Sequence, residues 1–151
     1  YKRQLLDHLR DRMKSYQEET GSLYNLEATP AEGTSFRLAK IDRKLYPEIV
    51  CAGEDTPYYT NSTQLPVGYT NDLFEALDLQ APLQQIYTGG TVFHSFIGER
   101  IEDAALVASL VRRIAENYRI PYFTLTPSFS ICPVHGYIPG EHASCPLEQE
   151  A

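Results

Sequence analysis

The strongest chemical signal in this 151-residue chain is a group of two cysteines and two histidines separated by short spacers. Cys132 and His135 form a C-x2-H pair, and His142 and Cys145 form an H-x2-C pair beyond a Gly/Pro-containing stretch. Two-residue spacers let both side chains of a pair point at one ion, and thiolate with imidazole suits tetrahedral zinc. The pattern predicts a zinc site; the alternative is a pair of buried thiols with surface histidines.

Three further candidate sites are short polar segments at the ends of expected strands. Residues 61–62 offer uncharged groups suited to a sugar, but also suit a tight Asx turn. The glycine pair within residues 88–90 allows close backbone approach to a ligand, but also suits a bulge or a barrel corner. Residues 126–130 could present N–H groups and hydroxyls to a phosphate, or form an ordinary turn. The candidate residues are Asn61, Ser62, Thr88, Gly89, Gly90, Thr126, Ser128 and Ser130.

Composition limits the classes of function. A length of 151 residues suits one domain, and 42% hydrophobic with 22% charged residues is typical of a globular protein. The net charge of −7 argues against direct binding of nucleic acid, because no basic stripe is present to neutralise phosphates. Charged residues and glycines interrupt the apolar runs well short of a membrane span, so we expect a soluble protein.

The cysteines and the first residue indicate the setting of the chain. Cys51 stands apart from the other cysteines and is expected to be a small buried or loop residue. Three cysteines do not make a disulfide framework, so the composition favours a reducing cytoplasm as the compartment. The chain starts at Tyr1 with a helical pattern beginning at once. We therefore expect a piece of a longer polypeptide.

Helical and strand patterns alternate along the chain. The apolar spacing predicts helices over residues 1–19, 29–42, 71–79 and 101–118, with Thr29 as an N-cap and Pro30 as the first helical residue of the second. Strands are predicted over residues 23–28, 58–62, 87–94 and 122–125. This alternation predicts an α/β fold with mainly parallel strands and helical crossovers, whose working loops lie at the carboxyl ends of the strands.

Six segments, taken in order, resemble one family. They are Glu19-Thr-Gly21, Glu27-Ala-Thr-Pro-Ala-Glu-Gly33, Tyr59-Thr-Asn-Ser-Thr-Gln-Leu-Pro-Val67, Tyr87-Thr-Gly-Gly-Thr-Val-Phe-His94, Thr126-Pro-Ser-Phe-Ser-Ile-Cys-Pro-Val-His-Gly-Tyr137 and Gly140-Glu-His-Ala-Ser-Cys-Pro146. Together they are similar to the later part of the large subunit of the anaerobic, class III ribonucleoside-triphosphate reductases. The resemblance covers almost the whole chain.

The resemblance implies a fold and an activity. Residues 1–130 would be a segment of a ten-stranded α/β barrel of the glycyl-radical enzyme type, and residues 131–151 an incomplete zinc-ribbon-like tail. The activity would be reduction of ribonucleoside triphosphates to deoxyribonucleotides for DNA synthesis by glycyl and thiyl radicals. An activating enzyme with an iron–sulfur cluster and S-adenosylmethionine would install the glycyl radical.

The resemblance also implies that this segment is inactive alone. The finger-loop cysteine and the radical-bearing glycine of the family have no counterpart here, and no Arg-Val-x-Gly-Tyr stretch occurs. A barrel segment without its neighbouring strands would expose strand edges, so we expect a homo-oligomer. A stand-alone, non-catalytic zinc-binding module derived from the family is one alternative. Another glycyl-radical enzyme with a different substrate is a second.

One departure from the family pattern concerns the metal ligands. Family members commonly continue Cys-Pro-x-Cys where this chain has Cys145-Pro-Leu-Glu148. The fourth ligand beside Cys132, His135 and Cys145 would then be His142, or the carboxylate of Glu148, which zinc accepts. His142 suits zinc better as a partner of thiolates. Loss of metal binding is the third possibility.

Overall fold

The computed structural model describes residues 1–53, 55–97, 101–127, 129–139, 142 and 144–148. The chain divides into two compact units, which we describe separately. Tyr1–Phe93 and Arg119–Tyr122 form the first, and His94–Tyr118 with Phe123–Ala151 form the second. The expected division into residues 1–130 and 131–151 stays a prediction. No helix in the described ranges is both long and apolar enough to cross a membrane.

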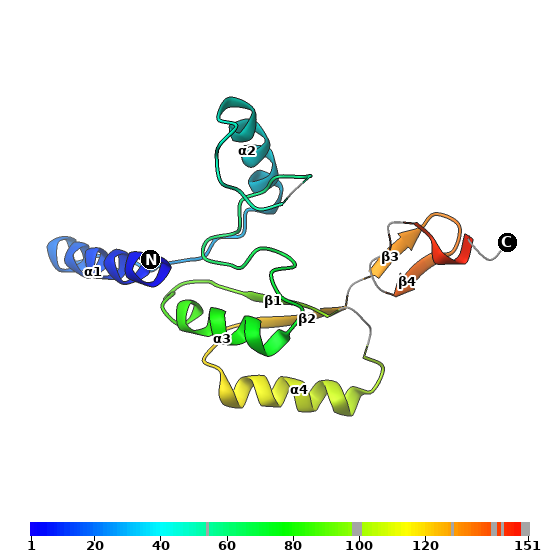
Figure 1. Ribbon diagram of the computed structural model, residues 1–151. Coiled ribbons are helices and arrows are strands. Elements are labelled where there is room, and N and C mark those ends of the chain that lie inside the picture. Colours follow the sequence, from blue (N-terminus) through cyan, green and yellow to red (C-terminus); the bar gives the residue numbers. More distant parts are fainter. Residues whose placement is uncertain (54, 98–100, 128, 140–141, 143, 149–151) are drawn as a thin grey trace. The chain divides into compact units, whose positions relative to one another are not determined.

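Helix α1 (Lys2–Thr20) (Figure 1) opens the first unit and confirms the helix predicted for residues 1–19. It ends at Gly21, which has a φ of 69° and donates its N–H to Gln17 O at 2.9 Å. A left-handed residue closes a helix in this way, and glycine adopts that conformation without steric strain. The helix buries Leu6 in a core cluster with Ala28, Ile86 and Tyr87.

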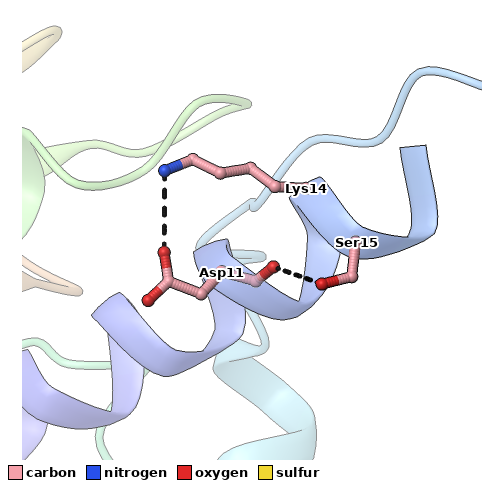
Figure 2. Close-up of polar contacts among 3 residues, drawn as sticks. All are labelled: Asp11, Lys14 and Ser15. Carbon is pink, nitrogen blue, oxygen red and sulfur yellow. Dashed lines mark hydrogen bonds and ion pairs between the residues drawn. The ribbon is translucent and has the colours of Figure 1, made fainter. Parts of the chain in front are cut away.

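The remaining faces of α1 are largely exposed and carry local polar contacts. Figure 2 shows Lys14 Nζ lying 3.6 Å from Asp11 Oδ1, and Ser15 Oγ donating to Asp11 O at 3.3 Å. Such exposed pairs at helical spacing contribute a few tenths of a kcal/mol, about 0.2–0.5 each. These local pairs do little to position α1, which is held by the burial of Leu6 and by hydrogen bonds from Lys2 Nζ to Thr63 O and Gln64 O at 3.2 and 3.3 Å.

Helix α2 (Glu32–Leu45) begins later and ends later than predicted. The expected cap at Thr29 is wrong, because Ala31 is the N-cap and no side chain caps the helix. The N–H of Ala31 instead donates to Asn61 Oδ1 at 3.1 Å. A long-range bond thus replaces the local one that the sequence suggested.

Two predicted strands of the first unit are wrong. Residues 23–28 are irregular, although Ala28 N donates to Gly90 O at 2.8 Å and Leu26 O accepts from Thr88 N and Gly89 N at 3.1 and 2.8 Å. Within residues 58–62 only one isolated bridge forms, between Ala52 and Tyr58. The partners of both segments lie in irregular loops, so the hydrogen bonds do not extend into a ladder.

Helix α3 (Leu73–Gln84) has the predicted start. Oδ1 of the N-cap Asp72 accepts from Phe74 N at 2.8 Å and from Glu75 N at 3.2 Å. These bonds satisfy two N–H groups that have no partner within the helix. The helix continues through Pro82 to Gln84, beyond the predicted end at residue 79.

The second unit contains strand β1 (Phe93–Ile97) from His94 onward, helix α4 (Ala104–Asn117) and strand β2 (Phe123–Pro127) (Figure 1). The two strands pair in a two-stranded sheet. Phe93 N donates to Tyr122 O at 2.9 Å, and His94 Nδ1 lies 3.1 Å from Thr124 Oγ1. From Phe93 to His94 on β1, the contacting residue on the other side moves forward from Tyr122 to Thr124. The two strands therefore run parallel, and α4 is the predicted crossover between them.

The second unit ends in a hairpin that the sequence reasoning did not predict. Strands β3 (Phe129–Cys132) and β4 (Gly136–Pro139) are antiparallel, with Cys132 opposite Gly136. A single 3-10 turn, η1 (Pro146–Glu148), follows. This hairpin carries the cysteine–histidine pair.

Candidate metal centre and neighbouring loops

The β3–β4 hairpin brings Cys132 and His135 together. Cys132 is the last residue of β3, and the turn at residues 133–135 returns the chain to β4. Gly136 has a φ of 76°, a left-handed conformation that a side chain would disfavour. Because Gly136 is paired with Cys132, the tight turn places the thiol and the imidazole on one side of the hairpin.

Cys145 completes a three-residue cluster around His135. His135 Nδ1 lies 3.5 Å from Cys132 Sγ and 3.4 Å from Cys145 Sγ, and the three ligand atoms lie within 4.8 Å of one another. Zinc–sulfur and zinc–nitrogen bonds of about 2.3 and 2.0–2.1 Å at a tetrahedral angle require a sulfur–nitrogen distance of about 3.6 Å. Both sulfur–nitrogen distances are therefore close to the value that tetrahedral zinc requires.

The backbone of the turn favours the thiolate form of Cys132. The N–H groups of His135 and Val134 donate to Cys132 Sγ, each at 3.4 Å. These two bonds are the main reason that the pKa of Cys132 lies below its ordinary value. The thiolate is the form in which a cysteine can bind a metal ion, so the turn favours the form of Cys132 that metal binding would require.

The two candidates for the fourth ligand differ in what surrounds them. His142 is exposed and donates its backbone N–H to Ser130 Oγ at 2.8 Å. His142 lines a pocket of about 210 Å³ together with Cys132 and Cys145. Among the described residues, however, the side chains whose potential ligand atoms lie within 4.8 Å of one another are those of Cys132, His135 and Cys145, without His142. The side chain of Glu148 lies outside the described residues. The identity of the fourth ligand stays a prediction.

In the first unit, two of the candidate substrate loops are held close to a common segment. Residues 88–90 pair with residues 26–28, and Leu26 N donates to Thr88 Oγ1 at 3.0 Å. Asn61 contacts Ala31, a few residues further along that same segment. A Cβ at Gly89 would lie 3.1 Å from Asn25 Cγ, so the absence of a side chain permits this approach. The structure thus gathers Asn61, Ser62, Thr88, Gly89 and Gly90.

The remaining candidate substrate residues belong to the second unit. On β2, Thr126 Oγ1 donates to Thr124 Oγ1 at 3.4 Å. On β3, Ser130 Oγ accepts a hydrogen bond from the backbone N–H of His142. Ser128 lies outside the described residues. Phosphate contact by these three residues stays a prediction.

Sequence reasoning missed a set of buried polar side chains beside the first-unit loops. Gln80 and Gln84 are fully buried on α3, where they share a face with the buried Leu77. Thr63 and Thr91 are buried at the two loops. Amide side chains at positions where a helix otherwise buries apolar residues were the available signal.

These features define a class of protein: an α/β chain with a parallel β–α–β crossover and a thiolate–imidazole cluster on a hairpin. Comparison with known families gives a narrower assignment. A model of the family described as "Anaerobic ribonucleoside-triphosphate reductase" matches residues 1–148. The chain belongs to the anaerobic ribonucleoside-triphosphate reductase family.

Individual relatives agree with this assignment. The anaerobic ribonucleoside-triphosphate reductase of Enterobacteria phage T4 is 32% identical over 90 residues, which are 60% of this chain and 15% of that protein. The Escherichia coli protein of the same name is 30% identical over 88 residues, 58% of this chain and 12% of its own length. The aligned part of the chain thus makes up about one seventh to one eighth of the length of these relatives, which are oxidoreductases.

A solved structure agrees with the fold. The anaerobic ribonucleotide reductase from Thermotoga maritima, with MES in its active site, matches 94% of this chain and 22% of its own chain. The TM-score is 0.64 and the sequence identity is 26%. The predicted α/β fold class, with helices and parallel strands, is confirmed.

Proposed function

We propose that these residues belong to the large chain of an anaerobic ribonucleoside-triphosphate reductase, which converts ribonucleoside triphosphates to deoxyribonucleotides for DNA synthesis. In this proposal they supply part of a barrel wall around the substrate and part of a zinc site. The observation that supports it most is the family match over residues 1–148, which includes both the polar loops and the Cys/His cluster. The 151 residues contain neither a finger-loop cysteine nor a radical-bearing glycine motif, so we expect them to be inactive alone.

The radical partners of this proposal come from the family resemblance. A glycyl radical would be stored elsewhere in the polypeptide, after installation by an activating enzyme with an iron–sulfur cluster and S-adenosylmethionine. We expect a cytoplasmic homo-oligomer that binds neither nucleic acid nor membrane, in keeping with the net charge of −7.

The first-unit loops would bind the ribose. Asn61 and Ser62 provide uncharged donors and acceptors that can hydrogen-bond sugar hydroxyls without ionising beside a radical. The bond from Ala31 N to Asn61 Oδ1 fixes the amide plane and so directs its N–H groups. Backbone groups of Thr88, Gly89 and Gly90, and the hydroxyls of Thr126, Ser128 and Ser130, would contact the sugar or the phosphates.

The cluster in the second unit would hold zinc through Cys132, His135 and Cys145. The two sulfur–nitrogen distances of 3.4 and 3.5 Å support this donor set. We propose His142 as the fourth ligand, with Glu148 as the alternative. A closed, four-ligand zinc site is structural, and here it would tie the β3–β4 hairpin to the segment that contains Cys145.

The reductase activity is tested with the full-length protein, assayed without oxygen after radical installation by its activating enzyme. We expect ribonucleoside triphosphates to yield deoxyribonucleotides while electron paramagnetic resonance records the glycyl radical. A stable glycyl radical with no turnover of any ribonucleotide would reject the proposal and favour a glycyl-radical enzyme with another substrate.

Zinc is tested by metal analysis of the full-length protein purified without chelators. We expect about one zinc per chain at this site, as four-coordinate structural sites hold one ion. Cys132→Ser and Cys145→Ser should each remove most of it, whereas Cys51→Ser should not, because Cys51 lies in the other unit. Folded protein with less than about a tenth of that zinc would exclude the site.

A further inference from the structure

Four buried polar side chains connect the two candidate ribose loops through the interior of the first unit. They are Thr63, Gln80, Gln84 and Thr91, each at most 8% exposed. Gln80 and Gln84 are one turn apart on α3, so their amides lie on the same face of the helix. A buried amide is unfavourable unless it is hydrogen-bonded, so its partners decide what it does.

The hydrogen bonds form an unbroken chain from one loop to the other. Gln80 Nε2 donates to Thr63 O at 3.4 Å, and Gln84 Nε2 donates to Gln80 Oε1 at 3.3 Å. Thr91 Oγ1 then donates to Gln84 Oε1. A second link is direct, because Thr63 Oγ1 lies 3.0 Å from the Tyr87 hydroxyl. Residues 61–64 and 87–91 are therefore joined both directly and through α3.

The backbone conformation of Ser62 indicates that its surroundings constrain the loop at residues 61–64. Ser62 has a φ of 45°, a left-handed conformation that a non-glycine residue keeps only when its surroundings impose it. On one side Asn61 is bound to Ala31, and on the other Gln64 Nε2 donates to Val92 O at 2.6 Å. The strained residue lies between anchored neighbours.

We propose that Gln80 is a positioning residue, which touches no substrate but sets the spacing of residues 61–64 and 87–91 and thereby places Asn61 and Ser62 against the ribose. The proposal rests on the proposed function, in which these loops bind substrate. Gln80 suits this role because its Nε2 donates to the loop at residues 61–64, while its Oε1 accepts from Gln84, which is bonded to the loop at residues 87–91. Removal of this amide should loosen both loops together.

The first test compares Gln80→Leu with Gln85→Leu in the full-length protein. Leucine has nearly the volume of glutamine but no hydrogen-bonding group, and Gln85 is an exposed glutamine just after α3. We expect Gln80→Leu to lower kcat about 10- to 100-fold, because a misplaced ribose reacts slowly although its phosphates still bind. KM, zinc content and glycyl radical content should stay near the parent values, and Gln85→Leu should match the parent throughout. Parent-like turnover of Gln80→Leu would overturn the proposal. An activity loss that only follows the loss of folded, radical-bearing protein would also overturn it.

The second test needs no turnover. Amide hydrogen exchange should speed up in Gln80→Leu at residues 61–64 and at residues 87–91, while α2 exchanges at the parent rate. Gln85→Leu should leave all three unchanged. Unchanged exchange at either loop would overturn the coupling. A parent protein that reduces no ribonucleotide would instead refute the proposed function, and the exchange result would still decide whether Gln80 couples the loops.

Discussion

The hydroxyl of Tyr59 donates a 2.8 Å hydrogen bond to Oδ2 of Asp42, which joins the chain just before residues 61–64 to helix α2. This bond is the main reason that the pKa of Tyr59 lies above its ordinary value, and burial and the Asp42 charge add to the effect. The folded state therefore favours the neutral phenol.

The first prediction concerns alkaline pH. A raised pKa contributes stability that is fully present below the ordinary tyrosine value of about 10 and is lost as the pH rises through the raised value. We expect Asp42→Asn to lower the pKa of Tyr59, so that the free energy of unfolding decreases less as the pH rises into the alkaline range. Ultraviolet difference titration against Tyr59→Phe isolates the Tyr59 signal. An identical titration in the parent and in Asp42→Asn would contradict the prediction.

The second prediction distinguishes the two candidates for the fourth zinc ligand. We expect His142→Ala in the full-length protein to retain much less zinc than the parent after dialysis against a chelator, because a three-ligand site holds the ion less tightly. Glu148→Gln should retain the parent amount. The opposite result would assign the fourth position to Glu148.

The third prediction concerns Ser95 on β1. Its side-chain oxygen is buried, with the residue 4% exposed, and has no hydrogen-bond partner among the described residues. An unsatisfied buried polar group costs about 1–3 kcal/mol, so Ser95→Ala should raise the free energy of unfolding by about 1 kcal/mol. Denaturant melts would show a higher midpoint for this variant but not for Ser22→Ala, an exposed serine. A lower midpoint would mean that the hydroxyl has a function or a partner.

The fourth prediction concerns the start of α3, which carries Gln80. Asp72→Ala removes the acceptor for Phe74 N and Glu75 N, and loss of such a cap costs about 1 kcal/mol. Asp72→Asn keeps a side-chain oxygen and should lose much less. Denaturant melts of the two variants provide the comparison, and equal losses would show that the charge, rather than the hydrogen bonds, stabilises the helix.

The helices could be predicted from the sequence where local signals act alone. Gly21 ends α1 and Asp72 begins α3 through contacts with residues only a few positions away. The start of α2 could not be predicted, because Ala31 is bound by Asn61, which is 30 residues distant. The alternating patterns of residues 23–28 and 58–62 suggested strands, but whether a strand forms depends on a partner that such a pattern does not specify.

The cysteine–histidine cluster was predictable because two of its side chains lie on one short hairpin and the third follows that hairpin within a few residues. Cys132 and His135 are fixed by a turn of three residues, and Cys145 reaches them after β4. The spacing of Gln80 and Gln84 from Leu77 signalled that they lie on the buried face of α3, but it could not identify their hydrogen-bond partners. Their role depends on loops far away in the sequence, which only the tertiary structure brings to them.

The loop at residues 61–64 has a consequence for the order of folding. Its hydrogen-bond partners are 17 to 62 residues away in the chain: Gln80, Tyr87, Val92, Ala31 and Lys2. Contacts of such separation form slowly, because the entropy of closing long loops must be lost before the bonds can compensate for it. The proposed ribose site should therefore acquire its geometry late in folding, after α1 and α3 have formed and only once the ribosome has released residues up to Val92.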